Sequence, residues 1–218
     1  MNILAIDTCT EVASVTLYSS NVKTTRVLTD IAKSSGYILK LCDEVFKEAG
    51  NNLQEVDFIS YTKGPGAFTG VRMCVGVVQG LSLSCGIPTL GFSTLELLAF
   101  RASKILKKDK IATAIDARMG EVYWAVYDNG SISNMRICKP ENVDNLGASF
   151  VGVGSGWKVH NDELIKASQI NHTDSSIYPE STDLIDLSLL AIESGQKATF
   201  DLPQPIYLRN NVAQKSLK

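Results

Sequence analysis

The 218-residue sequence has no excess of positive charge and only two histidines. Twenty-one Lys and Arg residues stand against 23 Asp and Glu residues, which gives a net charge of −2. A protein that binds nucleic acid alone through its phosphates normally carries a basic excess. Direct, unaided RNA binding is therefore disfavoured. His160 and His172 belong to no H-x-x-x-H or H-E-x-x-H pattern, so no motif supports a histidine-ligated catalytic metal.

Cysteine pairs with metal-ligand or redox spacing are also missing. The five cysteines are an odd number, form no C-x-x-C pair and lie in apolar segments: Cys9, Cys42, Cys74, Cys85 and Cys138. Buried free thiols show this pattern. We therefore expect neither a disulfide framework nor a cysteine metal site.

The first residues lack the features of a targeting segment. No basic region precedes the first apolar run, and that run reaches Asp7 after a few residues. A signal peptide or a membrane span needs a longer apolar stretch. We expect a cytoplasmic protein without a membrane anchor here.

Apolar periodicity predicts an α/β chain, because continuous apolar runs and alternating segments interleave with amphipathic stretches. In the first half we expect strands at 3–6, 13–18, 23–28, 58–61 and 89–92, and helices at about 34–49, 71–85 and 93–102. Ser34 or Ser35 and Ser93 are candidate caps, and Gly50 is a candidate stop. In the second half we expect a strand at 150–154 and helices near 162–167 and 183–193. The charged stretch 104–110 predicts a boundary between domains 1–106 and 107–218.

A short pattern occurs twice, once in each half. Ala5-Ile6-Asp7 followed by Glu11-Val12 recurs as Ala114-Ile115-Asp116 followed by Glu121-Val122, with one residue more between the parts. Each copy is an apolar strand, an aspartate, a short turn and a second strand. From the residues alone, an internal duplication and a chance likeness of two buried strands both remain open.

A glycine-rich loop, Gly64 to Gly70, precedes a predicted helix, so its backbone N–H groups and the helix dipole could hold a phosphate. It is not a Walker A motif, because no Lys-Ser/Thr pair follows, and a purely structural tight turn is an equal alternative. Asp7 ends a buried strand, where it could orient a ligand or cap the local turn. The candidate nucleotide-facing residues are Asp7, Gly64, Gly66 and Thr69.

The predicted helix 71–85 is apolar nearly all round, with Arg72 as its one charge. A helix of this kind must be covered on most sides, and it is short for a membrane crossing, which needs about 20 apolar residues. Gly76, Gly80 and Ser84 lie four residues apart and form a stripe without large side chains. One face can meet the sheet while the other meets a partner. The alternative is a central helix enclosed by its own chain.

Four stretches carry a resemblance to a known family: ILAIDT, KGPGAFTGVR, AIDARMGEVYWAVY and YLRNNVA. Together, and in this order over nearly the whole chain, they resemble the bacterial TsaB family, also called YeaZ, of tRNA threonylcarbamoyladenosine biosynthesis. The resemblance implies two tandem ribonuclease-H-like domains of the acetate-kinase, actin and Hsp70 (ASKHA) superfamily. It would explain the repeated pattern as a true duplication.

The resemblance also implies partners. Such a protein is the non-catalytic partner of TsaD, which transfers the threonylcarbamoyl group to N6 of adenosine 37 in tRNAs that read ANN codons. The ATPase TsaE joins the complex. This chain would contact tRNA only as part of that complex. The first and second helices of the N-terminal domain pack against TsaD, or against a second copy in a homodimer. The implied interface residues are Ile38, Leu41, Met73, Gly76, Val77 and Gly80.

The family likeness further implies that this chain holds no metal of its own. TsaD binds its metal with a pair of histidines, whereas the corresponding helix start here is Ser34-Ser35-Gly36-Tyr37-Ile38, which carries no ligand. ATP or ADP would then bind at the interface of the complex and not to this chain alone.

The rival function is an independent small kinase or ATPase of the same superfold, for which Asp7 and Asp116 would be the acidic pair that holds Mg²⁺. A peptidase has less support, because Gly152-Val153-Gly154-Ser155-Gly156 does not match the nucleophile elbow G-x-S-x-G. The residues from Gly154 to Trp157 are better interpreted as a strand-to-helix turn.

Overall fold

The first sheet of the computed structural model, which describes residues 1–29 and 36–209, begins with an antiparallel meander. Strands β1 (Ile3–Asp7), β2 (Ala13–Ser19) and β3 (Val22–Leu28) pair in succession, as their apolar patterns predict. Strands β4 (Phe58–Thr62) and β5 (Thr89–Phe92) add parallel to β1, which gives the order β3-β2-β1-β4-β5.

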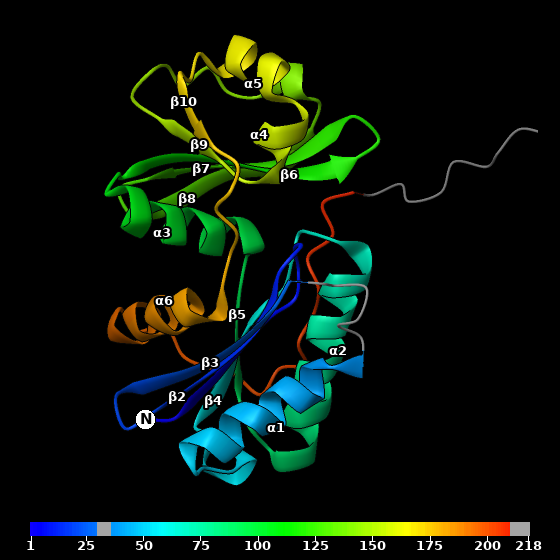
Figure 1. The fold of residues 1–218 in the computed structure, drawn as a ribbon, viewed down its shortest axis with the longest axis vertical. Coiled ribbons are helices and arrows are strands. Elements are labelled where there is room, and N and C mark those ends of the chain that lie inside the picture. Colours follow the sequence, from blue (N-terminus) through cyan, green and yellow to red (C-terminus); the bar gives the residue numbers. More distant parts are fainter. Residues whose placement is uncertain (30–35, 210–218) are drawn as a thin grey trace, which may run out of the picture.

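The second sheet repeats this topology, and Figure 1 shows the two sheets one above the other. Strands β6 (Lys110–Arg118), β7 (Glu121–Asp128) and β8 (Ser131–Cys138) form the meander. Strands β9 (Val151–Val153) and β10 (His172–Asp174) follow in parallel, so the order is β8-β7-β6-β9-β10. The same order and directions in both halves agree with a duplication and not with a chance likeness of two strands.

Helices α1 (Ile38–Ala49) and α2 (Phe68–Cys85) cover one face of the first sheet and share one apolar core with it. Helix α1 ends at Gly50, which adopts the left-handed conformation (φ 67°) as predicted. The predicted caps Ser34 and Ser35 lie outside the described residues. Two short 3₁₀ turns lie at Leu53–Glu55 (η2) and Pro140–Asn142 (η3).

The predicted strand-to-helix turn follows β9, and three helices lie around the second sheet. Helix α4 (Ser155–Val159) begins directly after its N-cap Gly154, and α5 (Asn161–Ser168) follows it. Helix α3 (Thr94–Leu106) is capped by Ser93, whose hydroxyl accepts a hydrogen bond from Leu95 N at 3.2 Å. It runs to Leu106, four residues further than expected, so the charged stretch forms its end.

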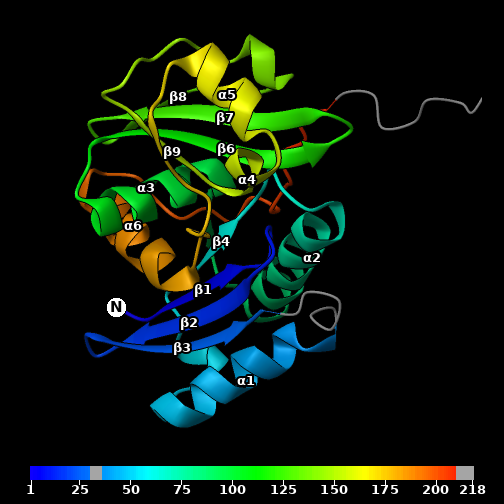
Figure 2. The same cartoon turned by 45° about the horizontal axis from the view of Figure 1, so that its top comes forward.

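The two halves exchange helices across the predicted boundary at residue 106. Helix α3 belongs to the first segment, yet its apolar side packs against the second sheet. Helix α6 (Ser181–Glu193) belongs to the second segment, yet Leu184 and Ile185 lie in the core of the first sheet. The division at 106/107 therefore separates the two sheets, while α3 and α6 each pack across it. Figures 1 and 2 show α3 and α6 between the sheets.

An ionic network joins α3 to α6. Lys104 Nζ contacts Asp183 Oδ1 and Asp186 Oδ2, both at 2.6 Å. Arg101 pairs with Asp183 and also with Glu180, the latter at 2.9 Å. Because Asp183 is largely buried and meets two cations, this network fixes the two central helices against each other.

Helix α2 has one buried face and one exposed face. Val71, Cys74 and Val78 pack in the core, whereas Gly76, Gly80 and Leu83 are exposed. Its mean hydropathy of 1.3 and its 18 residues would permit a membrane crossing by length and composition alone, a test that core helices of soluble proteins also pass. No described residue covers Gly76 or Gly80, so residues 1–29 and 36–209 do not enclose this helix.

The cysteines are free, and their burial varies. Cys9, Cys42 and Cys74 are buried in the first core, while Cys85 and Cys138 are half-buried. The expectation of free thiols is confirmed, and burial is complete for three of the five.

Candidate functional site between the two halves

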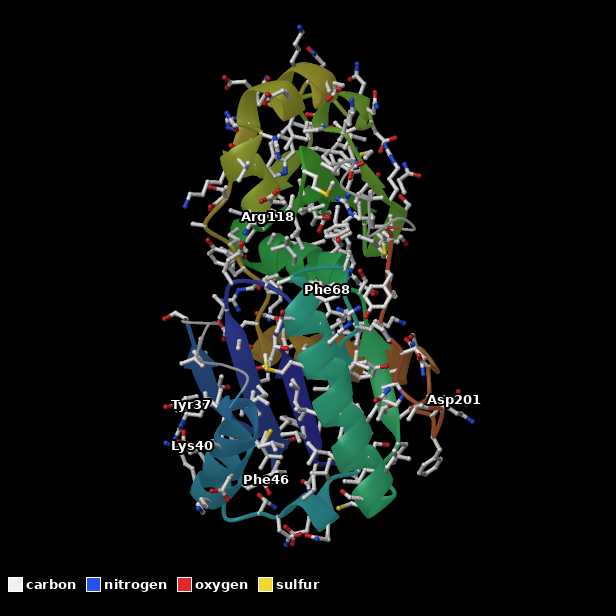
Figure 3. The ribbon with its side chains drawn as sticks, turned by 90° about the vertical axis from the view of Figure 1, so that its right-hand side faces the viewer. Tyr37, Lys40, Phe46, Phe68, Arg118 and Asp201 are labelled. Carbon is white, nitrogen blue, oxygen red and sulfur yellow. The ribbon has the colours of Figure 1, made fainter. Side chains whose placement is uncertain are left out.

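A cavity of about 780 Å³ lies between the two sheets. Its walls come from the connection after β1, the start of α2, the end of β6 with the β6–β7 turn, and the C-terminal residues Tyr207 to Arg209. Figure 3 shows Phe68 at the upper end of α2 and Arg118 above it. The volume lies within the roughly 300–1,000 Å³ of small-molecule sites.

The two aspartates of the repeated pattern have different surroundings. Asp7 is fully buried and is not among the residues that line the cavity. Its Oδ1 accepts hydrogen bonds from Thr62 Oγ1 at 2.5 Å and from Cys9 N at 3.1 Å. Its Oδ2 is buried and has no partner among the described residues. Burial raises the pKa of Asp7 to about 6, although these two hydrogen bonds act in the opposite direction.

Asp116 lines the cavity, but its carboxylate is already paired. Oδ1 accepts a hydrogen bond from Arg118 N at 2.9 Å, and Oδ2 meets Arg118 Nη1 at 2.9 Å. His160 Nε2 lies 3.8 Å from Oδ1. Asp7 thus lies in the core outside the cavity that Asp116 lines, so the two predicted Mg²⁺ ligands do not both line the cavity. Within residues 1–29 and 36–209, no group of three or more His, Cys, Asp or Glu side chains could hold a metal.

The glycine-rich loop is shaped by its contact with the chain after β1. A Cβ atom at Gly66 would lie 2.0 Å from the Cys9 carbonyl oxygen, and one at Gly70 would lie 2.1 Å from the Thr8 carbonyl oxygen. Ala67 N also donates to Cys9 O at 2.8 Å. Only glycine permits this approach, so the structural interpretation of the loop holds at these two positions.

The four predicted nucleotide-facing residues separate in the structure. Gly66 lines the cavity, together with Ala67 and Phe68 at the start of α2. Asp7, Gly64 and Thr69 are not among the lining residues. Nucleotide binding stays a prediction, and it rests on Gly66 alone among the residues chosen.

Sequence reasoning missed the cationic and aromatic side chains of the cavity. The Arg72 guanidinium lies 3.1 Å from the centre of the Phe68 ring and 5.5 Å from that of Tyr207. Among the described residues Arg72 forms no ion pair. A guanidinium held against two rings can meet an anionic or planar group. The GVR and YLR motifs contain two of these residues, but their meeting depends on the path of the C-terminus.

The predicted partner residues lie on two different sides of α1 and α2. Ile38 and Leu41 are buried in the core, where they face the sheet. Met73 and Val77 are partly buried beside the same core. Gly76 and Gly80 are exposed, and a Cβ at either position would meet nothing within 4 Å. We name the exposed face of α2 around these glycines, which includes Leu83, the α2 face; Figure 3 shows α2 beside α1.

Comparisons with known proteins assign the family. A family model described as TsaD, tRNA N6-adenosine threonylcarbamoyltransferase, matches residues 31–216. The TsaB protein of Escherichia coli is 34% identical over 227 residues, which cover 100% of this chain and 98% of that protein. The chain belongs to the TsaB family. The TsaB protein of Haemophilus influenzae is 32% identical and is covered to 97%.

A solved structure gives the same assignment at the level of the fold. A Pseudomonas aeruginosa protein described as similar to the peptidase YeaZ has a TM-score of 0.85 at 34% identity, with 95% of this chain and 99% of that chain covered. The YeaZ structure from the same organism has a TM-score of 0.83. The expected α/β fold, with two tandem domains of the same topology, is confirmed.

Proposed function

We propose that this protein is a non-catalytic scaffold subunit in the biosynthesis of tRNA threonylcarbamoyladenosine. The names of the TsaB relatives support the process. In this proposal the protein binds TsaD in the cytoplasm, TsaE joins them, and the complex modifies adenosine 37 of tRNAs that read ANN codons. The tRNA is bound through the complex. The observation that carries the scaffold role is the exposed α2 face on an otherwise packed core helix.

The α2 face is suited to close contact with another helix. Gly76 and Gly80 leave the helix backbone bare over one turn, and Leu83 adds an exposed apolar side chain that is 72% accessible. A partner helix can approach such a stripe closely and bury apolar area without steric conflict. Ile38 and Leu41 are buried in the core that α1 and α2 share, so they do not form part of this surface. TsaD is the proposed occupant, and a second copy of the chain takes its place when TsaD is absent.

An arginine at position 80 tests this surface. A long charged side chain at the centre of a helix contact must be buried unpaired or must hold the helices apart, and either costs several kcal/mol. Gly80→Arg should therefore abolish binding to TsaD in size-exclusion chromatography. The isolated variant should stay folded, because position 80 is open to solvent.

A matched control adds the same charge elsewhere. Ile105 is 54% exposed on α3, and Ile105→Arg should bind TsaD as the unmodified chain does. Circular dichroism and a melting curve establish that both variants are folded. A folded Gly80→Arg variant that binds TsaD at unchanged affinity would remove the α2 face from the interface.

The rival function, an independent kinase or ATPase, requires Asp7 and Asp116 to act on one Mg²⁺. The burial of Asp7 outside the cavity argues against that role. Measuring ATP hydrolysis by the isolated chain separates the two functions, since turnover of several per second would favour the enzyme. We expect turnover far below that rate.

A further inference from the structure

The C-terminal residues 199–209, which we name the strap, run in extended form along the first half and then cross to the second (Figure 1). Thr199 and Thr89 exchange backbone hydrogen bonds at 2.7 and 2.9 Å. The Pro203 carbonyl accepts from Gln79 Nε2 at 2.7 Å, and Ile206 N donates to Lys63 O at 2.7 Å. The strap is thus fixed to the first half up to Ile206.

Arg209 attaches the end of the strap to the second half. Its Nη2 lies 2.7 Å from Glu121 Oε2 and donates to the carbonyl oxygens of Ala117 and Arg118 at 3.1 and 3.4 Å. The Arg209 side chain is 19% exposed. Only two residues lie between Ile206 and Arg209, so the three backbone steps of this tether span at most about 11 Å.

The turn that Arg209 holds is conformationally demanding. Arg118, Met119 and Gly120 are all left-handed, with φ of 62°, 57° and 73°. Non-glycine residues adopt this region at a cost of roughly 1–2 kcal/mol each. The Arg209 hydrogen bonds to the carbonyls before and within the turn offset part of that cost. Release of Arg209 would therefore loosen the turn as well as the strap.

The position of this contact relates it to the cavity. Arg118, Met119, Tyr207 and Arg209 all line the cavity, so the contact closes one side of it. The packed pair α3 and α6, with its ionic network, joins the halves on the opposite side (Figure 1). The halves are thus held firmly at one edge and by a short tether at the other.

We propose that the strap is a latch: the contacts of Arg209 with Glu121 and the β6–β7 turn hold the cavity at its present width, and their release opens it. Opening pivots on α3 and α6 and leaves both cores intact. Because the latch is an ion pair that is partly exposed to solvent, added salt weakens it. The inference does not depend on the identity of the partner that binds the α2 face.

A cysteine in the cavity wall measures the opening. Thr10 lines the cavity, is 4% exposed, and its Oγ1 has no hydrogen-bond partner among the described residues, so Thr10→Cys removes no bond. The rate at which iodoacetamide alkylates this thiol is followed by peptide mass spectrometry in the full chain. Cys42, on the buried face of α1, serves as an internal reference for general unfolding.

Two variants break the latch from opposite sides. With Arg209→Ala or with Glu121→Gln, the cysteine at position 10 should be alkylated at least tenfold faster while the rate at Cys42 stays unchanged. Arg136→Ala removes an ion pair of similar geometry, 2.9 Å from Asp144 and confined to the second half, and should change neither rate. The proposal is overturned if neither latch variant accelerates position 10, or if Cys42 accelerates by the same factor.

Discussion

Replacing Asp7 by asparagine should change how the stability of this protein depends on pH. Asp7 is fully buried, and its pKa is raised from 3.8 to about 6. One pKa unit corresponds to about 1.36 kcal/mol, so the shift of about two units amounts to roughly 3 kcal/mol. Desolvation is the main cause, because the buried Oδ2 has no hydrogen-bond partner among the described residues.

The sign follows from proton binding. Between pH 3.8 and about 6 the folded state keeps the Asp7 proton, whereas the unfolded state has lost it. The free energy of unfolding therefore falls as pH rises through this window, and the full penalty of about 3 kcal/mol is present above pH 6. An asparagine at this position would not titrate. Its amide oxygen can still accept from Thr62 and Cys9, while the buried NH₂ group adds a cost that is independent of pH.

Urea denaturation of both proteins from pH 4 to pH 7 isolates this effect. The stability of Asp7→Asn minus that of the unmodified protein should increase by roughly 2 kcal/mol over this range, because at pH 4 the unfolded carboxyl is already more than half ionised and other titrating groups cancel in the difference. Thr62→Val removes a hydrogen bond that lowers the pKa of Asp7, so it should move the window to higher pH. A difference that stays constant from pH 4 to pH 7 would refute the assignment of a strained buried carboxylate.

Five further substitutions test separate parts of the structure. Asp116→Ala, like Asp7→Ala, should leave tRNA modification by the reconstituted complex within about tenfold, or about 1.4 kcal/mol, and a loss of several thousandfold in a folded variant would reveal a catalytic role. Gly66→Ala should cost about 2 kcal/mol of stability through its clash with a backbone carbonyl, whereas Gly76→Ala should add up to about 1 kcal/mol; equal melting temperatures would contradict this. Asp183→Asn should cost about 2 kcal/mol because Arg101 loses a charged partner, and an unchanged urea midpoint would show that the network adds nothing.

Local patterns predicted most elements of the first half, because burial and turn chemistry act over a few residues. Strand β5 and the cap at Ser93 lie where expected. Helix α2 begins at Phe68, three residues before the predicted start at Val71. The sequence predicted the later start because glycine at position 70 disfavours a helix locally. Gly70 is needed because the helix start approaches the Thr8 carbonyl closely. Local sequence rules cannot predict this contact between distant residues.

The sequence patterns did not predict which elements pack against each other over long range. The periodicity of 183–193 predicted helix α6 but not its packing against the first sheet. An apolar stripe indicates that a helix is covered on that side, but not by which sheet. For the same reason the apolar face of α1 identifies core residues such as Ile38 rather than an outer surface. The cavity residues Arg72 and Tyr207 meet only through the path of the strap. The partner interface itself stays a prediction.

Nucleoside analysis of tRNA tests the central claim most directly. TsaD and TsaE, supplied with tRNA and the reagents for modification, would be incubated without this protein, with the unmodified protein, and with Gly80→Arg. The account predicts threonylcarbamoyladenosine with the unmodified protein and little or none in the other two reactions. Equal amounts of threonylcarbamoyladenosine with and without this protein would contradict it.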